Sequence, residues 1–156
     1  MENRKGDSIE KQLNYIDGRA LYYGFLAGAN KIFENQHQLN KINVFPVADA
    51  DTGTNFASTM RSIIDMVEPN RDVKTTVDSL ANAALIGARG NSGIIFAQFL
   101  YGFSTGIGPT ESLSVANFAM ALKESVKYAY QAVTNPVEGT ILTVIREWAD
   151  FIYQIK

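Results

Sequence analysis

Two aspartates separated by one residue, Asp49 and Asp51, are the side chains of this sequence best suited to do chemistry. Carboxylates so close repel each other, and a hard cation such as Mg²⁺ relieves the repulsion while water and phosphate fill its other positions. A helix is expected to begin soon after them, and free N–H groups at a helix start favour phosphate. The alternative is a solvated turn with Asp and Thr as helix caps. The residues that follow the pair are Thr52, Gly53, Thr54 and Asn55.

The segment GARGNSG, residues 87–93, is a second glycine-rich loop before an expected helix. Its glycines allow backbone N–H groups to surround a phosphate, and Arg89 can stabilise the charge of that phosphate. The pattern matches neither the P-loop nor the dinucleotide-binding motif. A helix–helix connection capped by Ser92 or Asn91 explains the segment equally well. The candidate phosphate-binding residues are Gly90, Asn91, Ser92 and Gly93.

A third loop, residues 134–140, again precedes an expected helix. Its polar groups and the apolar residues that follow them can accept a flat base. For this loop alone, an ordinary glycine-bearing turn with Thr140 as the cap is the simpler interpretation. The candidate residues are Gly139, Thr140, Ile141 and Leu142.

The elements that must position these loops are predicted to be helices, because apolar residues recur at three- and four-residue spacing. The periodic segments begin near residues 17, 55, 76, 91, 114 and 140 and end near residues 35, 67, 86, 103, 133 and 156. Residues 73–77 (VKTTV) are the best local strand candidate, but the run is short. The expected fold class is all-α, a bundle of about six helices. The helix after Ser92 is apolar on nearly every side, which predicts a central helix or one that meets missing helices or another subunit of a homo-oligomer.

Composition excludes several kinds of site and partner. The 156 residues contain no Cys and one His, which excludes zinc–thiolate, disulfide and multi-histidine sites within the chain. The net charge of -2 gives no basic surface for nucleic acid. Residues 91–110, the longest uncharged stretch, are interrupted by glycine and polar residues and make a poor membrane span. Residues 1–16 predict a flexible N-terminal arm without a signal-peptide core, so a cytoplasmic location is expected.

Taken together, the three loops resemble the signature segments of one family. The segments NVFPVADADTGTN (43–55), GARGNSG (87–93) and PVEGTILTVIRE (136–147) stand in the order found in the kinase domain of bacterial fatty acid kinase. That domain is related to the nucleotide-binding (DhaL-type) subunit of dihydroxyacetone kinase. The resemblance covers roughly residues 17–156. It implies an antiparallel helical barrel that holds Mg²⁺ and ATP or ADP at one rim.

The resemblance also implies a role for each candidate residue. Asp49 and Asp51 correspond to the magnesium-binding aspartates of the family, and Asn43 is the candidate for a further ligand upstream. The phosphates are expected along residues 52–55 and 90–93, with Arg89 stabilising the transferring group. The adenine is expected beside residues 139–142.

The sequence departs from the family pattern at several points. Ala50 stands where the family has Gly between the aspartates, which restricts the backbone of the metal loop. About six helices are expected, fewer than in the family, so the last helices are expected to be missing and the chain to be a fragment of a longer protein.

The resemblance implies a phosphotransferase that phosphorylates a fatty acid carboxylate presented by a fatty-acid-binding protein or a fused domain of the DegV type. The alternatives are a nucleotide-binding or partner-docking module without independent activity, a kinase for dihydroxyacetone or another small hydroxyl compound, and a helical interaction domain that binds no nucleotide.

Overall fold

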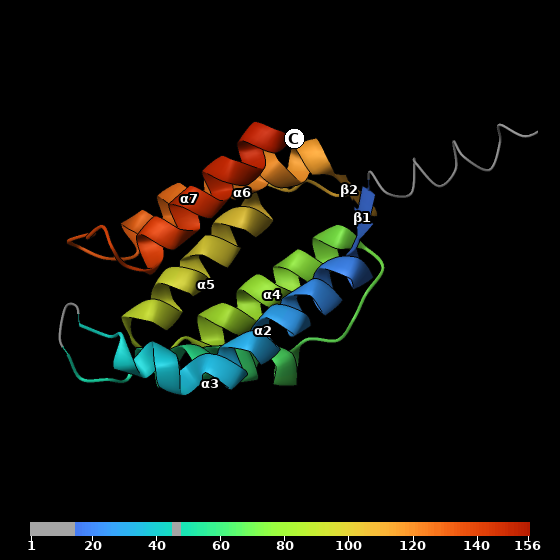
Figure 1. The fold of residues 1–156 in the computed structure, drawn as a ribbon. Helices are drawn as coiled ribbons and strands as arrows, with labels where there is room; N and C mark the ends of the chain where they lie inside the picture. Colours follow the sequence, from blue (N-terminus) through green and yellow to red (C-terminus); the bar gives the residue numbers. More distant parts are fainter. Residues whose placement is uncertain (1–14, 45–47) are drawn as a thin grey trace, which may run out of the picture.

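The computed structural model describes residues 15–44 and 48–156. Over this part of the chain it contains six helices and one two-stranded antiparallel sheet, which confirms the all-α class (Figure 1). The arm predicted for residues 1–16 lies outside the described residues, except for the last two, which belong to the first strand. The elements are β1 (Tyr15–Asp17), α2 (Gly18–Lys41), α3 (Thr52–Met66), α4 (Val73–Gly87), α5 (Gly90–Thr105), β2 (Ser112–Ser114), α6 (Val115–Gln131) and α7 (Ile141–Ile155).

Three of the predicted helices begin with a capping side chain. Asp17, Ser114 and Thr140 each accept a hydrogen bond from a backbone N–H two or three residues later. These bonds satisfy donors that a helix start leaves without intrahelical partners. The predicted cap of α5 is wrong, because the helix begins at Gly90 and both Asn91 and Ser92 lie inside its first turn.

The strand content differs from the sequence prediction. The VKTTV segment forms the start of α4, where Val73, Thr76 and Val77 are buried and Asp72 caps the helix. The two short strands were not predicted, since β1 and β2 pair only three residues each across nearly a hundred positions of sequence. Such short pairings show no periodic pattern along either segment.

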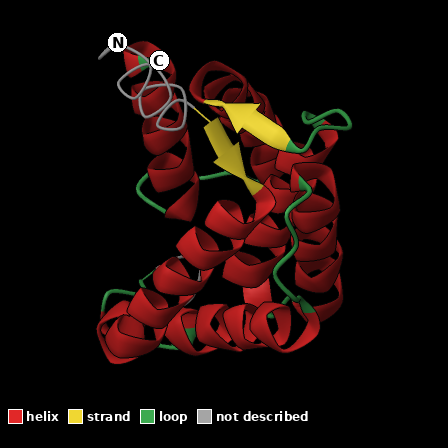
Figure 2. Ribbon diagram, turned by 90° about the vertical axis from the view of Figure 1, so that its right-hand side faces the viewer, coloured by secondary structure: helices red, strands yellow, loops and turns green. Residues whose placement is uncertain are grey.

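Successive helices alternate in direction, so α3, α5 and α7 begin at the end of the molecule where α2, α4 and α6 finish (Figure 1). The short sheet β1–β2 lies toward the opposite end of the molecule (Figure 1 and Figure 2). The loops that precede α3, α5 and α7 are therefore gathered at one end of the fold.

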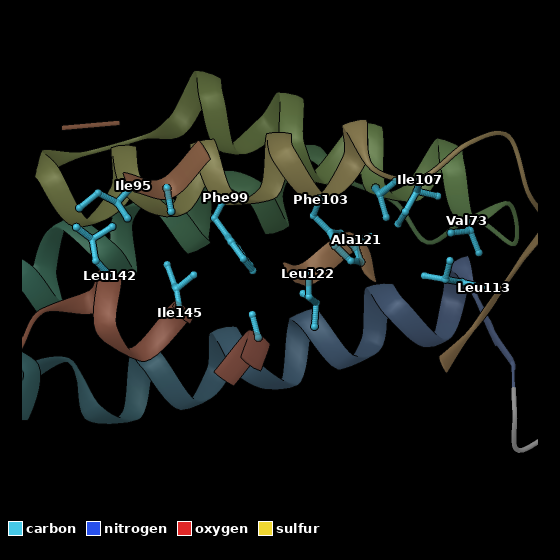
Figure 3. Close-up of a cluster of buried hydrophobic side chains, with 13 residues drawn as sticks. Val73, Ile95, Phe99, Phe103, Ile107, Leu113, Ala121, Leu122, Leu142 and Ile145 are labelled. Atoms are coloured by element: carbon cyan, nitrogen blue, oxygen red, sulfur yellow. The ribbon is translucent and has the colours of Figure 1, made fainter. Parts of the chain in front are cut away.

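Helix α5 is the central helix, as its apolar sequence predicted. It packs against α3, α4, α6 and α7 and divides the interior into two apolar clusters. Ile95, Phe99 and Phe103 enter the cluster shared with α6 and α7 (Figure 3), while Ala97 and Leu100 enter the cluster shared with α2, α3 and α4. This central position fixes the start of α5 relative to the starts of α3 and α7. No helix of the described residues is long and apolar enough to cross a membrane.

Candidate functional site

The two aspartates lie on the exposed loop that leads into α3, and each is oriented by an asparagine. Asn43 Nδ2 donates to Asp49 Oδ1 over 2.6 Å, and Asn55 Nδ2 donates to Asp51 Oδ2 over 2.7 Å. Each amide occupies one carboxylate oxygen. Within the described ranges no side chain donates to the remaining oxygens, Asp49 Oδ2 and Asp51 Oδ1. Two oriented carboxylates thus keep one oxygen each for a ligand.

Mg²⁺ fits this donor set. Among the described residues no group of three or more acidic, histidine or cysteine side chains can hold a metal ion. An ion bound here would take its protein ligands from Asp49 and Asp51 and fill its other positions with water or phosphate, the arrangement that Mg²⁺ prefers. The amide of Asn43, half-buried beside Asp49, donates to this carboxylate and so orients it, and its oxygen stays the predicted further ligand.

Ala50, between the two aspartates, has a left-handed backbone with φ of 55°. It is the only described residue other than glycine with a positive φ. A side chain makes this conformation costly, so the loop stores a local strain that glycine would relieve. The sequence identified Ala50 as a departure from the family pattern, and the structure gives the reason why glycine suits the position. Residues 45–47 of the same segment lie outside the described residues.

The start of α3 is locked against the end of α2. A Cβ added to Gly53 would lie 2.1 Å from the carbonyl oxygen of Gln36, so only glycine permits this approach. The hydroxyl of Thr54 accepts from Gln36 Nε2 and Asn40 Nδ2 over 3.2 and 3.0 Å, and the Thr54 N–H donates to Asn40 Oδ1. Gln36 and Asn40 were missed because their polar run reads as a solvated surface. Thr54, a candidate for phosphate binding, is held by α2 through its side chain.

The second loop packs directly onto the start of α3. Gly90 has φ of 60°, and a Cβ there would lie 2.5 Å from Nδ2 of Asn55, the residue that orients Asp51. Ser92 Oγ donates to the carbonyl oxygen of Thr52 over 3.4 Å. The structure therefore brings the first and second loops together. Asn91 and Gly93 occupy the same first turn of α5, with Asn91 exposed and Gly93 buried.

Thr59 joins these two loops and was not predicted. Its side chain is fully buried, and its Oγ1 accepts from the Arg89 N–H over 3.0 Å. A Cβ on Gly93 would lie 2.4 Å from the same oxygen. No sequence signal distinguishes this threonine from others, because its role depends on the crossing of α3 and α5.

The side chain of Arg89 is not beside the aspartates. It donates to the carbonyl oxygen of Ala88 and lines a shallow hollow of about 290 Å³ with Asp65 and Met66, at the far end of α3. Within the described part of the chain, no ion pair joins Arg89 to Asp49 or Asp51. The role in phosphate stabilisation stays a prediction for this residue.

The third loop presents its backbone rather than an apolar surface. Leu142 is 1% exposed and packs beside Ile95 in the core (Figure 3), so the prediction that its side chain faces a base is wrong. Ile141 is half-buried against the same cluster. Gly139 has φ of 80°, with open space around the position that a Cβ would take. What this loop offers a ligand is the exposed backbone at Gly139 and the capping residue Thr140.

A side-chain network at Glu138 holds this third loop. The Glu138 carboxylate accepts from Tyr130 Oη over 2.7 Å, from Arg146 over 3.0 Å and from the hydroxyl of Thr143. Hydrogen bonds from Thr143 and Tyr130, together with the Arg146 charge, lower the pKa of Glu138. Burial and the neighbouring Glu138 raise the pKa of Tyr130. No sequence pattern singles out Tyr130, Thr143 or Arg146, because their shared contact with Glu138 depends on the packing of α6 and α7.

Comparison with known proteins identifies a family. A family model described as the DAK2 domain matches residues 46–156. Protein YloV of Bacillus subtilis is 43% identical over 136 residues, which cover 86% of this chain and 25% of that protein. Uncharacterised proteins of Staphylococcus saprophyticus and Staphylococcus epidermidis are 39% identical over 141 residues and 37% identical over 139 residues. These alignments cover 89% and 88% of this chain and 26% and 25% of those proteins. The chain thus spans about a quarter of the length of these relatives.

Proposed function

The chain belongs to the DAK2 domain family, a nucleotide-binding family related to dihydroxyacetone kinase, and from this membership we propose that it is a Mg-ATP-dependent phosphotransferase domain. The observation that carries the proposal is the pair of aspartates at the end of the fold where α3, α5 and α7 begin (Figure 1). Each has one oxygen to which no side chain of the described residues donates. Three helix starts favour the negative charge of a polyphosphate, and two carboxylates suit the Mg²⁺ that accompanies it.

The proposed site divides the nucleotide among the three loops. Asp49 and Asp51 would hold Mg²⁺, which would supply neutralisation of the phosphate charge. The phosphates lie along residues 52–55 and 90–93, at the starts of α3 and α5. The N–H groups of Thr54, Asn55 and Gly93 already donate within the protein, so the phosphates take the other N–H groups of these two segments. The exposed backbone of residues 139–140 lies on the side of the base. Arg89 reaches the transferring group only after its side chain leaves the hollow along α3.

The proposed acceptor is a fatty acid carboxylate. One of its oxygens attacks the γ-phosphorus, the bond from that phosphorus to the β–γ bridging oxygen breaks, and ADP leaves with the electron pair. The product is an acyl phosphate. Phosphoryl transfer depends mainly on positioning and charge neutralisation, so the chain needs no nucleophile of its own.

The proposed partner presents the fatty acid, since the acceptor must be held in line with the γ-phosphate. It is a separate fatty-acid-binding protein or a domain of the DegV type in the same polypeptide. Relatives about four times as long as the aligned segment have room for such a domain.

Acyl phosphate formation tests the proposal. The chain is incubated with Mg-ATP and a fatty acid loaded on a fatty-acid-binding protein, and hydroxylamine traps the product as a hydroxamate. We expect hydroxamate and ADP in equal amounts, and neither from Asp51→Asn. ADP released without hydroxamate, but with phosphorylated dihydroxyacetone when this compound is added, would reassign the acceptor.

A nucleotide-binding module without independent activity is the second candidate, and the strained backbone at Ala50 favours it. An altered metal loop can keep nucleotide affinity while the phosphates are displaced from the line of attack. This second function would be supported if the wild-type chain binds Mg-ATP but gives no hydroxamate in the trapping assay, and if Ala50→Gly restores hydroxamate formation.

A further inference from the structure

We propose that Glu138 and Thr143 are positioning residues for the base of the nucleotide, acting through the backbone N–H of Gly139. The inference rests on the proposed function, because it concerns how the third loop is prepared for the base. Neither side chain needs to touch the nucleotide. Their role is to hold the third loop in the one conformation that binds the base, so that binding does not have to pay the entropy of ordering this loop.

The direction of the hydrogen bonds through Thr143 is fixed. The Gly139 N–H donates to Thr143 Oγ1 over 2.7 Å, so the hydroxyl oxygen acts as the acceptor. The single hydroxyl proton is then donated to Glu138 Oε2. A relay therefore runs from the loop backbone through Thr143 to the carboxylate, and the donors on both of its oxygens match an ionised Glu138.

Glu138 is fully engaged within the protein. Its Oε1 accepts from Tyr130 on α6, and its Oε2 accepts from Thr143 and Arg146 on α7. The carboxylate ties both helices to the loop between them. Unlike Asp49 and Asp51, it has no oxygen without a donor, so the network suits a supporting role rather than a ligand role.

Gly139 has the open surroundings that an approaching ligand needs. Apart from Gly139 and its two chain neighbours, no heavy atom of the described residues lies within 4 Å of the position that its Cβ would take, and its φ of 80° favours glycine. At Gly90, by contrast, the corresponding space is filled by the Asn55 side chain. The left-handed backbone of Gly139 is thus held by the relay and faces free space, which is how a loop backbone can meet a flat base closely.

The test compares a nucleotide with a ligand that lacks the base. Affinities of the chain for Mg-ADP and for Mg²⁺ with inorganic triphosphate are measured by calorimetry. Thr143→Val removes the hydroxyl while keeping the shape, and Thr143→Ser restores the hydroxyl. Thr105→Val is the matched control, since the Thr105 hydroxyl bonds only the carbonyl oxygen of its own helix.

We expect Thr143→Val to weaken Mg-ADP binding about five- to tenfold, the effect of about one hydrogen bond, and to leave triphosphate affinity unchanged. Thr143→Ser recovers the ADP affinity, and Thr105→Val changes neither. Should Thr143→Val not fold, Tyr130→Phe removes a single hydrogen bond to Glu138. We expect it to weaken Mg-ADP binding about two- to threefold and to leave triphosphate affinity unchanged.

Equal losses for both ligands, or no loss for ADP, would overturn the positioning role while leaving the proposed function intact. A wild-type chain that binds triphosphate as tightly as ADP would also overturn it, because the third loop would then contribute nothing to base recognition. A wild-type chain that binds neither ligand would overturn the proposed function as well.

Discussion

The first and third loops use similar residue types in opposite ways. Each carries acidic residues followed by glycine and threonine at a helix start. In the first loop, Asp49 and Asp51 accept one amide donor each, and no other side chain in the described part of the chain donates to them. In the third loop, Glu138 accepts from three side chains on two helices. The comparison teaches that the number of donors already present, more than the residue type, separates a carboxylate that can bind a ligand from one that supports a loop.

The backbones of the two loops differ in the same sense. Each has a residue with positive φ, Ala50 at 55° in the first loop and Gly139 at 80° in the third. The supporting network of the third loop holds a residue that adopts this conformation freely. In the first loop the residue with positive φ is an alanine, whose side chain makes this conformation costly. The loop with free carboxylates is therefore the strained one.

The largest expected effect is that of Asp51→Asn on Mg²⁺-dependent ADP binding. The amide still accepts from Asn55 but loses the charge, so we expect more than about a hundredfold weaker affinity by calorimetry. Asp65→Asn makes the same charge change on an exposed turn of α3 and is expected to leave affinity unchanged. Equal Mg²⁺-dependent ADP affinity in wild type and Asp51→Asn would show that Asp51 is not a metal ligand.

A smaller effect is expected from Asn43→Ala. Without the amide, Asp49 loses the donor that orients it, and groups that orient a metal ligand typically contribute ten- to a hundredfold in affinity, so we expect about tenfold. Titration of Mg²⁺ at saturating ADP measures the change. The control is Asn35→Ala, whose amide bonds only the carbonyl oxygen of Lys31 on its own helix. A Mg²⁺ affinity unaltered by Asn43→Ala would mean that Asp49 is held without it.

Replacing Ala50 by glycine should stabilise the fold slightly. Relief of the left-handed strain is worth about 1–2 kcal/mol, and the greater freedom of glycine in the unfolded chain offsets about 0.4–1 kcal/mol of it. We expect a net gain between about 0 and 1.6 kcal/mol in the free energy of unfolding, measured with urea. Ala48→Gly, without a positive φ to relieve, is expected to destabilise the chain. Destabilisation by Ala50→Gly as well would argue against the strain.

The smallest expected effect is a pH dependence of the third loop. The pKa of Glu138 is lowered in the folded state by its hydrogen bonds and by Arg146, so its ionised form contributes stability above its ordinary pKa of 4.5. That contribution is lost as the pH falls through the lowered pKa. The melting temperature of Glu138→Gln should therefore lie below that of wild type at pH 7, with the gap closing in acid. A gap that stays constant down to pH 2 would exclude this linkage. Glu68→Gln, which removes an exposed charge outside the Glu138 network, is the control.

The sequence predicted those features that depend on local chemistry. Asp17, Ser114 and Thr140 act as caps because capping is decided within one helical turn, and α5 is central because a helix apolar all round must be covered. The loop that carries the two aspartates was also predicted correctly to lead into a helix.

The remaining features arise where distant segments meet. Asn40 reaches the start of α3 because α2 extends to Lys41, well beyond the periodic apolar residues that predicted an end near residue 35. Thr59 matters because α3 crosses α5 beside it. The position of the Arg89 side chain and the burial of Leu142 likewise depend on how the helices pack, so they could not be predicted from the sequence pattern.

The most direct test of the central claim is a thermal-shift titration of the chain with ATP, with and without Mg²⁺, and with excess EDTA as the control. A ligand that binds only the folded state stabilises it by about 2.7 kcal/mol at a hundredfold excess over Kd. We predict a rise in melting temperature that requires Mg²⁺ and is abolished by EDTA. The same rise without Mg²⁺, or none in a chain that melts cooperatively, would contradict the assignment of Asp49 and Asp51 to a metal–nucleotide site.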